Sequence, residues 1–381
     1  MPPISVLIKP ASGNCNMDCK YCFYCDEQKK REVASYGIMS EATLKNVIRK
    51  MVLHADGMCS IAFQGGEPTL AGINFYYKLI EYVKHYNRKN IKIEYALQTN
   101  GLIINEEWCR FFKENNFLIG LSLDGLQEIH DKYRHTKAGK PTYHTIEKAA
   151  AILEQYKVDY NILTVVHKDV VDSIEAIYGT YQAKGWHYQQ YIACLDPLFE
   201  QPGSYEYSLQ PTDYGRFLVK LFNSWFLDLK SNQQPYIRQF ENYIAILLGR
   251  MPESCEQRGS CSIQYVVEAD GSVFPCDFYM LDEYKLGNVN DTIIAVMDEK
   301  RKGLNFIEES LKISQECKQC EYYAICRCGC QRTRLKNNED QYKNYLCKGY
   351  KDFFKECLPR MRQIAGMIRR EEKIKGKMNS I

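Results

Sequence analysis

The chain has 381 residues, of which 45% are hydrophobic, and its formal net charge is +3 at pH 7. This length allows one large domain with an appendage or two domains, and the balanced charge is not typical of a nucleic-acid binder or a membrane-surface protein. No stretch approaches the ~20 apolar residues of a membrane span, and the amino-terminal run MPPISVLIKP is too short for a signal peptide, so we expect a cytoplasmic protein with no membrane partner.

Apolar, β-branched segments alternate with helix-like segments in the first half of the chain. The helices predicted most clearly cover residues 40–55, which Ser40 can cap, and residues 143–156. Strands that alternate with helices form parallel sheets with right-handed crossovers. Because we find six strands and not eight, the pattern predicts an α/β fold with a partial (β/α)6 TIM-like barrel. The predicted strands cover residues 4–10, 60–64, 92–98, 117–123, 160–166 and 187–195.

Polar and glycine-rich residues follow several of these strands. The stretches are QGGEP (64–68), QTNG (98–101), SLDG (122–125) and CLDP (194–197), and a cysteine-rich loop follows the first strand. Barrels of this type carry their active sites at the carboxyl ends of the strands. Ordinary turns also favour Gly, Asn and Asp, but the five loops together indicate a functional edge.

The second half of the chain differs in character. Residues 200–254 are predicted to be a linker and helices, a β-hairpin is expected around Asp270-Gly271, and 351–372 forms an amphipathic helix before a basic, frayed tail at 373–381. We therefore expect three parts: a barrel (1–230), a cysteine-rich extension (231–350) and a carboxyl-terminal helix with its tail (351–381).

Seventeen cysteines are present, and ten of them fall within residues 15–25 and 317–347. Because disulfides are rare in a reducing cytoplasm, clustering of this kind indicates metal or iron–sulfur ligation. Cys15, Cys19 and Cys22 form C-x3-C-x2-C, and three thiolates suit a [4Fe–4S] cluster with one iron left open, whereas structural zinc takes four protein ligands. A rival register, Cys19-Cys22-Cys25, should continue as a ferredoxin run with x3-C-P, and it does not.

The C-x3-C-x2-C loop with Tyr21 before its last cysteine resembles the signature of radical S-adenosylmethionine enzymes, and QGGEP resembles their GGEP motif. The resemblance implies that Cys15, Cys19 and Cys22 hold the cluster and that its open iron binds the methionine part of S-adenosylmethionine. By family position, the implied cofactor contacts are Tyr21, Gly66, Ser122, Arg134 and Leu195. Arg134 could pair with the cofactor carboxylate, or it could form a surface salt bridge with Glu128 or Asp131. We interpret His130, His135 and His187 as structural.

Eight further cysteines resemble, in order and spacing, the SPASM extension of radical enzymes that modify peptides and proteins. The resemblance implies two auxiliary [4Fe–4S] clusters, one held by Cys255, Cys261, Cys276 and Cys330 and the other by Cys317, Cys320, Cys326 and Cys347. Zinc bound by Cys317, Cys320, Cys326 and Cys330 is the alternative that spacing leaves open. Cys328 departs from the pattern, and Cys59, Cys109 and Cys357 are expected to pack in the core.

Longer stretches, among them LIKPASGNCNMDCKYCFY, IAFQGGEPTLAG and VVEADGSVFPCDFY, are similar to anaerobic sulfatase-maturating enzymes over residues 4 to about 365. This resemblance implies oxidation of a Cys or Ser in a sulfatase to Cα-formylglycine. The 5′-deoxyadenosyl radical would remove a Cβ hydrogen, Asp277 would act as the base, and an auxiliary cluster would take an electron. Asp277 could instead be a turn residue, or a hydrogen-bond acceptor that supports a neighbouring group. The implied partners are a sulfatase with a C/S-x-P-x-R motif and a reductant such as flavodoxin or ferredoxin, with no nucleic acid, and the protein is expected to be a monomer.

Two other classes of function remain open, one enzymatic and one not. A related radical enzyme that forms a thioether or an epimer in a ribosomal peptide would share the cofactor and most cysteines, but we find no leader-peptide module at either end. A non-enzymatic iron–sulfur electron carrier would not need a barrel with loop motifs, and a zinc-based nucleic-acid binder should show a basic face.

Overall fold

The computed structural model describes residues 3–231, 233–337 and 341–378, and the chain divides into two compact units that alternate along the sequence. The first unit comprises Met1–Leu163, Pro197–Glu200 and Ile263–Phe306, and the second comprises Thr164–Asp196, Gln201–Ser262 and Ile307–Ile381. No helix in the part of the chain that the structure describes is long and apolar enough to cross a bilayer.

The first unit is built on a mostly parallel sheet with the strand order β12-β11-β10-β1-β3-β4-β5-β7. Alternate residues of β1, among them Val6 and Ile8, are fully buried. Ile61 and Phe63 of the neighbouring strand β3 are buried as well, so the two paired strands contribute to one apolar core. The five strands predicted for this unit are confirmed to within two residues at each end. Their bounds are β1 Ile4–Ile8, β3 Met58–Phe63, β4 Lys92–Thr99, β5 Phe117–Ser122 and β7 Tyr160–Val166.

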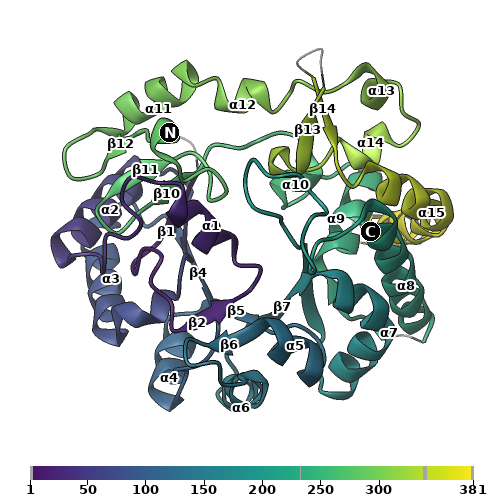
Figure 1. Ribbon diagram of the computed structural model, residues 1–381, viewed down its shortest axis with the longest axis horizontal. Coiled ribbons are helices and arrows are strands. Elements are labelled where there is room, and N and C mark those ends of the chain that lie inside the picture. Colours follow the sequence, from purple (N-terminus) through teal and green to yellow (C-terminus); the bar gives the residue numbers. More distant parts are fainter. Residues whose placement is uncertain (1–2, 232, 338–340, 379–381) are drawn as a thin grey trace. The chain divides into compact units, whose positions relative to one another are not determined.

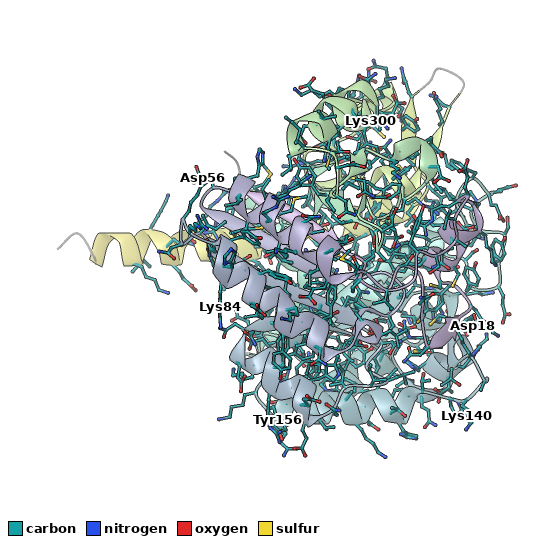
Figure 2. All side chains as sticks on the ribbon, turned by 90° about the vertical axis from the view of Figure 1, so that its left-hand side faces the viewer. Asp18, Asp56, Lys84, Lys140, Tyr156 and Lys300 are labelled. Atoms are coloured by element: carbon teal, nitrogen blue, oxygen red, sulfur yellow. The ribbon has the colours of Figure 1, made fainter. Side chains whose placement is uncertain are left out.

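Helices cover the outer side of this sheet (Figure 1). The predicted cap of α2 is confirmed, because the Ser40 hydroxyl accepts a hydrogen bond from the Thr43 N–H at 3.1 Å. The charged side chains of Lys84 and Lys140 lie at the outer surface (Figure 2). The helices of the first unit are α1 Phe23–Lys29, α2 Glu41–His54, η1 Pro68–Ala71, α3 Ile73–Tyr86, α4 Glu106–Glu114, α5 Gln127–Tyr133, α6 Tyr143–Gln155, η2 Asp282–Tyr284 and α11 Ile294–Gly303.

The predicted hairpin is confirmed, and it belongs to this sheet. Gly271 adopts φ +92°, which favours glycine in the turn, and the two hairpin strands pair antiparallel. Sequence reasoning did not foresee that the first hairpin strand runs parallel to β1, with Leu7 opposite Val266. A segment more than 250 residues away in sequence therefore lies beside the strand that precedes the cysteine loop. These short strands are β10 Tyr265–Val267, β11 Ser272–Phe274 and β12 Gly287–Asn288, and a separate pair is β2 Met17–Cys19 and β6 Arg134–Thr136.

The second unit is mainly helical. Where α15 packs on α8 and α9, the ring of Phe353 stacks on that of Phe240, and both meet the ring of Phe222 edge to face. The helix predicted over 351–372 is longer than expected, since it begins at Cys347 and continues through Met378 with Pro359 inside it; the last predicted tail residues, 379–381, lie outside the described chain. The elements are α7 Lys168–Ala183, β8 Tyr188–Ala193, α8 Pro211–Lys230, β9 Tyr236–Ile237, α9 Arg238–Leu247, α10 Cys255–Arg258, α13 Gln315–Lys318, α14 Tyr323–Cys326, η3 Gln331–Thr333, β13 Arg334–Lys336, β14 Tyr342–Asn344 and α15 Cys347–Met378, with α12 Phe306–Glu309 at the boundary.

Candidate active site

The cysteine loop follows β1 and is held at two points. The short strand β2 pairs antiparallel with β6, so that Cys19 lies opposite Arg134. Cys22 precedes the first residue of α1, and its N–H donates to the Cys19 carbonyl at 3.1 Å. The side chains of Cys15, Cys19 and Cys22 are all partly exposed. The three predicted ligands therefore lie in one anchored loop and remain accessible.

Hydrogen-bond donors surround the sulfur atoms of this loop. The Met17 N–H donates to Cys15 Sγ at 3.4 Å, and the Asn100 side chain donates to the same sulfur at 3.7 Å. A hydrogen bond from the Cys25 thiol lowers the pKa of Cys22 to about 6, whereas burial raises the pKa of Cys19 to about 12. Amide donors aimed at a sulfur stabilise a thiolate and are typical of iron–sulfur sites. The residues present thus fit a cluster bound by thiolates.

The QGGEP stretch packs against the main chain of the cysteine loop. A Cβ atom on Gly66 would lie 2.1 Å from the Asn14 carbonyl oxygen, so only glycine allows the cysteine loop to pack there. The Glu67 N–H donates to that same carbonyl at 2.8 Å. This packing explains the glycine at position 66 by a contact within the protein.

Glu67 is a buried carboxylate that joins two strand ends. Its Oε1 accepts bonds from the Thr69 N–H, the Thr69 hydroxyl and the Thr99 hydroxyl, at 3.0, 2.5 and 2.8 Å, and its Oε2 accepts from the Asn100 N–H at 2.7 Å. Burial raises the pKa of Glu67, while these bonds act in the opposite direction. Asn100 in turn donates to Asn16 Oδ1 at 2.7 Å. Asn100, in the loop after β4, therefore links the buried Glu67 to the cysteine loop.

Arg134 is buried, with 6% of its surface exposed, so the alternative of a surface salt bridge with Glu128 or Asp131 is wrong. Its Nη1 donates to the Tyr21 hydroxyl at 3.2 Å and lies 3.9 Å from Asp124 Oδ2, to which the Tyr21 hydroxyl also donates. Sequence reasoning named Tyr21 and Arg134 but missed Asp124, although the SLDG stretch that carries it had been recognised.

His130 is structural, as predicted. Its Nδ1 accepts from the Asp124 N–H at 3.1 Å, and its Nε2 lies 3.0 Å from the Thr142 hydroxyl. Because that hydroxyl donates its only proton to the Arg134 carbonyl at 2.9 Å, it must accept a proton from Nε2–H, which fixes the neutral tautomer. Burial and the Arg134 charge lower the pKa of His130 to about 4.

Asp277 lies in the first unit after β11, with 8% of its surface exposed. Its Oδ2 accepts a hydrogen bond from the Tyr24 hydroxyl at 2.6 Å, and its Oδ1 has no hydrogen-bond partner within the described residues. Burial raises the pKa of the carboxyl, and the charge of Lys9 opposes that shift. Asp277 stands in a turn, in which the Tyr279 N–H donates to the Cys276 carbonyl at 3.2 Å, and its side chain is nevertheless buried. Sequence reasoning missed Tyr24 and Lys9; the CFY run after the last ligand was the available signal for Tyr24.

Lys9 is almost completely buried, with 1% of its surface exposed. Its Nζ lies 3.9 Å from Glu268 Oε2 and 4.6 Å from the centre of the Tyr24 ring. Arg31 Nη1 donates to the same Glu268 oxygen at 2.7 Å. Burial alone would raise the pKa of Glu268, but these two cations hold it below its usual value. The ammonium group thus brings positive charge to the Tyr24–Asp277 pair.

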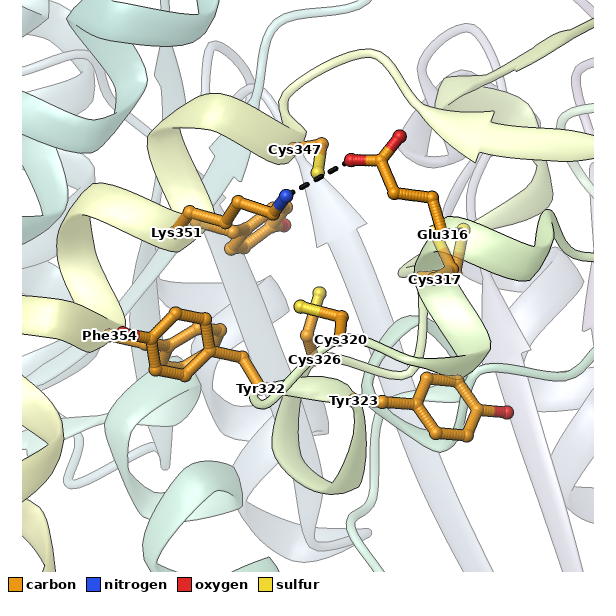
Figure 3. Close-up of a pocket in the computed structure, with 11 residues that line it drawn as sticks. Glu316, Cys317, Cys320, Tyr322, Tyr323, Cys326, Cys347, Lys351 and Phe354 are labelled. Atoms are coloured by element: carbon orange, nitrogen blue, oxygen red, sulfur yellow. Dashed lines mark hydrogen bonds and ion pairs between the residues drawn. The ribbon is translucent and has the colours of Figure 1, made fainter.

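A second group of thiols lines a small cavity in the second unit (Figure 3). Cys317, Cys320, Cys326 and Cys347, the four predicted ligands, all face it, together with Cys328. At its rim, Glu316 accepts hydrogen bonds from Lys351 at 3.0 Å and from Lys343 at 2.6 Å. This donor set fits the cluster that the family resemblance implies.

Three members of the other predicted set lie near one another in the second unit. Burial raises the pKa of the Cys330 thiol, and the nearby Cys255 and Cys261 thiols raise it further. The Arg332 N–H donates to Cys330 Sγ at 3.4 Å. The fourth member, Cys276, belongs to the first unit and immediately precedes Asp277.

Arg334, which sequence reasoning missed, ties together the segments that carry these thiols. Its side chain is buried and donates to four main-chain carbonyls. Two of them, Gly259 at 3.1 Å and Ser310 at 2.5 Å, lie near Cys261, whose N–H donates to the Ser310 hydroxyl. The other two, Cys328 at 3.1 Å and Gly329 at 2.5 Å, lie between Cys326 and Cys330.

The remaining predicted residues are placed as follows. Ser122 is buried at the end of β5, and Leu195 is half-buried after β8 in the second unit. Cys59, Cys109 and Cys357 are fully buried, which confirms that they pack in the core. Across residues 3–231, 233–337 and 341–378, no three His, Cys, Asp or Glu side chains are arranged to hold a single metal ion.

Comparisons with known proteins agree with this fold and site. Residues 10–180 match the radical SAM superfamily, and residues 255–321 match the iron–sulfur cluster-binding domain called SPASM. The parallel α/β fold, the C-x3-C-x2-C loop and the cysteine-rich extension thus define a radical S-adenosylmethionine enzyme with a SPASM domain, and the predicted fold class is confirmed.

The relatives narrow the class further. The chain is 44% identical to the cysteine-type anaerobic sulfatase-maturating enzyme of Clostridium perfringens, over 97% of this chain and 100% of that protein. It is 29% identical to the serine-type enzyme of Bacteroides thetaiotaomicron, over 94% of this chain and 90% of that protein. The solved structure of native anSMEcpe with bound AdoMet and the Cp18Cys peptide matches with a TM-score of 0.91 at 44% identity, over 96% of this chain and 100% of that one. The chain belongs to the family of anaerobic sulfatase-maturating enzymes.

Proposed function

We propose that this protein oxidises one specific cysteine of a sulfatase to Cα-formylglycine. Serine is the second candidate substrate. The preference for cysteine is supported by the higher identity to the cysteine-type relative, 44% against 29% for the serine-type relative. The observation that carries the proposal is the buried Asp277 carboxylate, which keeps one oxygen without a partner within the described residues.

The proposed cofactors are three [4Fe–4S] clusters and S-adenosylmethionine. Cys15, Cys19 and Cys22 would hold the first cluster, with Tyr21, Gly66, Ser122, Arg134 and Leu195 as contacts to S-adenosylmethionine. When bound, these groups supply a 5′-deoxyadenosyl radical that takes a hydrogen atom from the substrate Cβ, and an acceptor for the second electron. The auxiliary clusters would be held by Cys255, Cys261, Cys276 and Cys330 and by Cys317, Cys320, Cys326 and Cys347.

Asp277 would accept the thiol proton of the substrate. Its Oδ2 already accepts the Tyr24 O–H, so Oδ1 is the oxygen that can take a proton. Tyr24 fixes the plane of the carboxylate, and Lys9 keeps positive charge near it. Removal of this proton makes the substrate radical a stronger reductant, and a base placed for this purpose is typically worth 10²–10⁴-fold in rate. The product after loss of the electron is a thioaldehyde, which water converts to the aldehyde.

We also propose the partners of the reaction. The substrate would be a sulfatase polypeptide with a C-x-P-x-R or S-x-P-x-R motif, and a flavodoxin or ferredoxin would supply electrons. The protein would act as a monomer in the cytoplasm, and its parts would be a barrel (1–230), a SPASM domain (231–350) and a carboxyl-terminal helix (351–381).

A peptide assay tests this function. The reconstituted protein is incubated without oxygen with S-adenosylmethionine, a chemical reductant and a short peptide carrying C-x-P-x-R, and the product is read by mass spectrometry. We expect the mass loss that accompanies exchange of a thiol for an aldehyde, and an adduct with a hydrazine reagent. A thioether-linked or epimerised peptide would instead favour the ribosomal-peptide alternative, and cofactor cleavage without any change in the peptide would contradict both.

Asp277→Asn tests the base. The amide is nearly isosteric, so 5′-deoxyadenosine should still form and should still acquire deuterium from a peptide labelled at Cβ. Formylglycine should fall by ~10²–10⁴-fold, the usual effect of losing a general base. Asp282→Asn, an exposed carboxylate at the start of η2, is the control and should keep full yield. Normal formylglycine formation by Asp277→Asn would overturn the assignment.

A further inference from the structure

Five thiols, one more than a cubane cluster needs, line the cavity in the second unit (Figure 3). The additional thiol is Cys328, which is 2% exposed. Its sulfur lies 3.8 Å from the sulfur of Cys317, and this is the contact distance of two sulfur atoms. A packing cysteine would point into the apolar core, whereas this one faces the ligand cavity.

The main chain holds Cys328 in this orientation. Residues Arg327, Cys328 and Gly329 have φ values of +50°, +66° and +65°, in the left-handed region that favours glycine. The Cys328 carbonyl accepts hydrogen bonds from Arg334 Nε at 3.1 Å and from the Asn344 amide at 3.2 Å. The loop is therefore fixed from both sides, and the side chain of residue 328 has little freedom to turn away.

We propose that Cys328 is a reserve ligand of this auxiliary cluster, able to replace Cys317 at the same iron. The inference rests on the proposed function, which assigns a [4Fe–4S] cluster to Cys317, Cys320, Cys326 and Cys347. Because the two sulfur atoms are in contact, either reaches the same position with a small rotation of its side chain. In the exchange the Cys328 thiolate binds the iron that the Cys317 thiolate leaves, a proton passes from one thiol to the other, and no electron is transferred.

The pairing is specific to Cys317. The Cys328 thiol is in contact with the sulfur of Cys317, whereas Cys326 interacts with the Cys328 main-chain N–H, which a rotation of the side chain does not move. Loss of Cys317 should therefore be tolerated, while loss of Cys320 should not. The two positions lie three residues apart, at either side of the end of α13, and form a matched pair for substitution.

The experiment compares iron and acid-labile sulfide in four reconstituted full-length variants. Cys317→Ala should keep the iron content of the parent, as should Cys328→Gly, for which glycine suits the backbone. Cys320→Ala and the double variant Cys317→Ala/Cys328→Gly should each lose about four irons. Mössbauer spectra of Cys317→Ala should show a full complement of cubane iron.

The outcomes separate the inference from the function on which it rests. If Cys317→Ala loses as much iron as Cys320→Ala, Cys328 is not a reserve ligand, although the cluster assignment stands. If Cys320→Ala keeps all its iron, the assignment of the cluster itself fails and the inference fails with it. Should Cys317→Ala not fold, Cys317→Ser alone and with Cys328→Gly gives the same comparison with a nearly isosteric side chain, and equal iron loss in both would overturn the inference.

Discussion

The cysteine loop (residues 13–27) and the auxiliary region (residues 255–262 and 307–347) both gather thiols, but the surrounding protein holds them by opposite means. Around the cysteine loop, buried carboxylates on the following loops accept hydrogen bonds, with Glu67 joining two strand ends and Asp124 paired with Tyr21 and Arg134. In the auxiliary region, one buried cation, Arg334, donates to four main-chain carbonyls. Side chains at strand ends can hold one loop in position, whereas one guanidinium can bind several segments that have little regular structure.

The two regions also share a feature. In each, a thiol outside the predicted ligand set hydrogen-bonds a predicted ligand, Cys25 with Cys22 and Cys328 with Cys317. In both pairs this bond lowers the pKa of the ligand to about 6. Because each region is anchored by its own side chains, we predict that the two regions lose their iron independently, and the following substitutions test this.

The largest effect is expected for Cys15→Ala/Cys19→Ala/Cys22→Ala. This variant should lose all cofactor cleavage and about a third of the iron, because the auxiliary sites use other ligands. Iron analysis and 5′-deoxyadenosine assays measure both. Cys25→Ala, beside Cys22, is the matched control and should keep both. Loss of the first cluster in Cys25→Ala would revive the ferredoxin register, and retention of zinc after chelation in the parent would contradict the auxiliary clusters.

The second-largest effect is expected for Arg334→Lys. Lysine offers one ammonium in place of a planar fork, so several buried carbonyls lose their donor, and we expect the free energy of unfolding to fall by about 3 kcal/mol or more. Up to about eight irons should be lost while cofactor cleavage at the first cluster persists. Arg332→Lys, in which the guanidinium donates to the single Asp196 carbonyl, is the control. Equal loss of iron from all three clusters would show that the regions are not independent.

Glu67→Gln should have an intermediate effect confined to the first unit. In this variant the amide NH2 group faces N–H or O–H groups that now donate hydrogen bonds to Glu67. The hydrogen bonds lost there cost about 1–3 kcal/mol. We expect a lower melting temperature and weaker S-adenosylmethionine binding by calorimetry, with auxiliary iron unchanged. Glu81→Gln, an exposed carboxylate on α3, should change neither. A variant with unchanged binding would mean that Glu67 does not support the loop.

The smallest effect at neutral pH concerns His130, whose contribution changes with pH. Its pKa in the folded protein is about 4, below the ordinary 6.5, so the neutral form is favoured by the fold. This contribution is complete above pH 6.5 and is lost as the pH falls toward 4, which amounts to about 2 kcal/mol between pH 7 and 5. His130→Gln should flatten the pH dependence of urea unfolding by close to one proton, while the exposed His144→Gln should not. Identical slopes in both variants would contradict the buried neutral imidazole.

The sequence alone determined the parts of the molecule that depend on short-range patterns. Apolar, β-branched runs that alternate with helix-like segments located the strands from Ile4–Ile8 to Tyr188–Ala193, and the Ser40 cap followed from local hydrogen bonding. The spacing of Cys15, Cys19 and Cys22 indicated a cluster because three thiolates on one short loop can reach one point. The family resemblance, carried by longer motifs, supplied the assignment that the relatives then confirmed.

Tertiary structure decided what no local pattern could encode. The parallel pairing of β10 with β1 brings Asp277 close to Tyr24 and Lys9, which lie about 250 positions away in the sequence. Burial there raises the pKa of the Asp277 carboxyl, and the charge of Lys9 opposes that shift. The same holds for Arg134, which the sequence allowed on the surface and which the fold buries against Asp124, and for Cys328, whose sulfur meets that of Cys317 only because a left-handed loop turns it inward. Contacts of this kind depend on packing between distant segments, and a sequence pattern records only the neighbours along the chain.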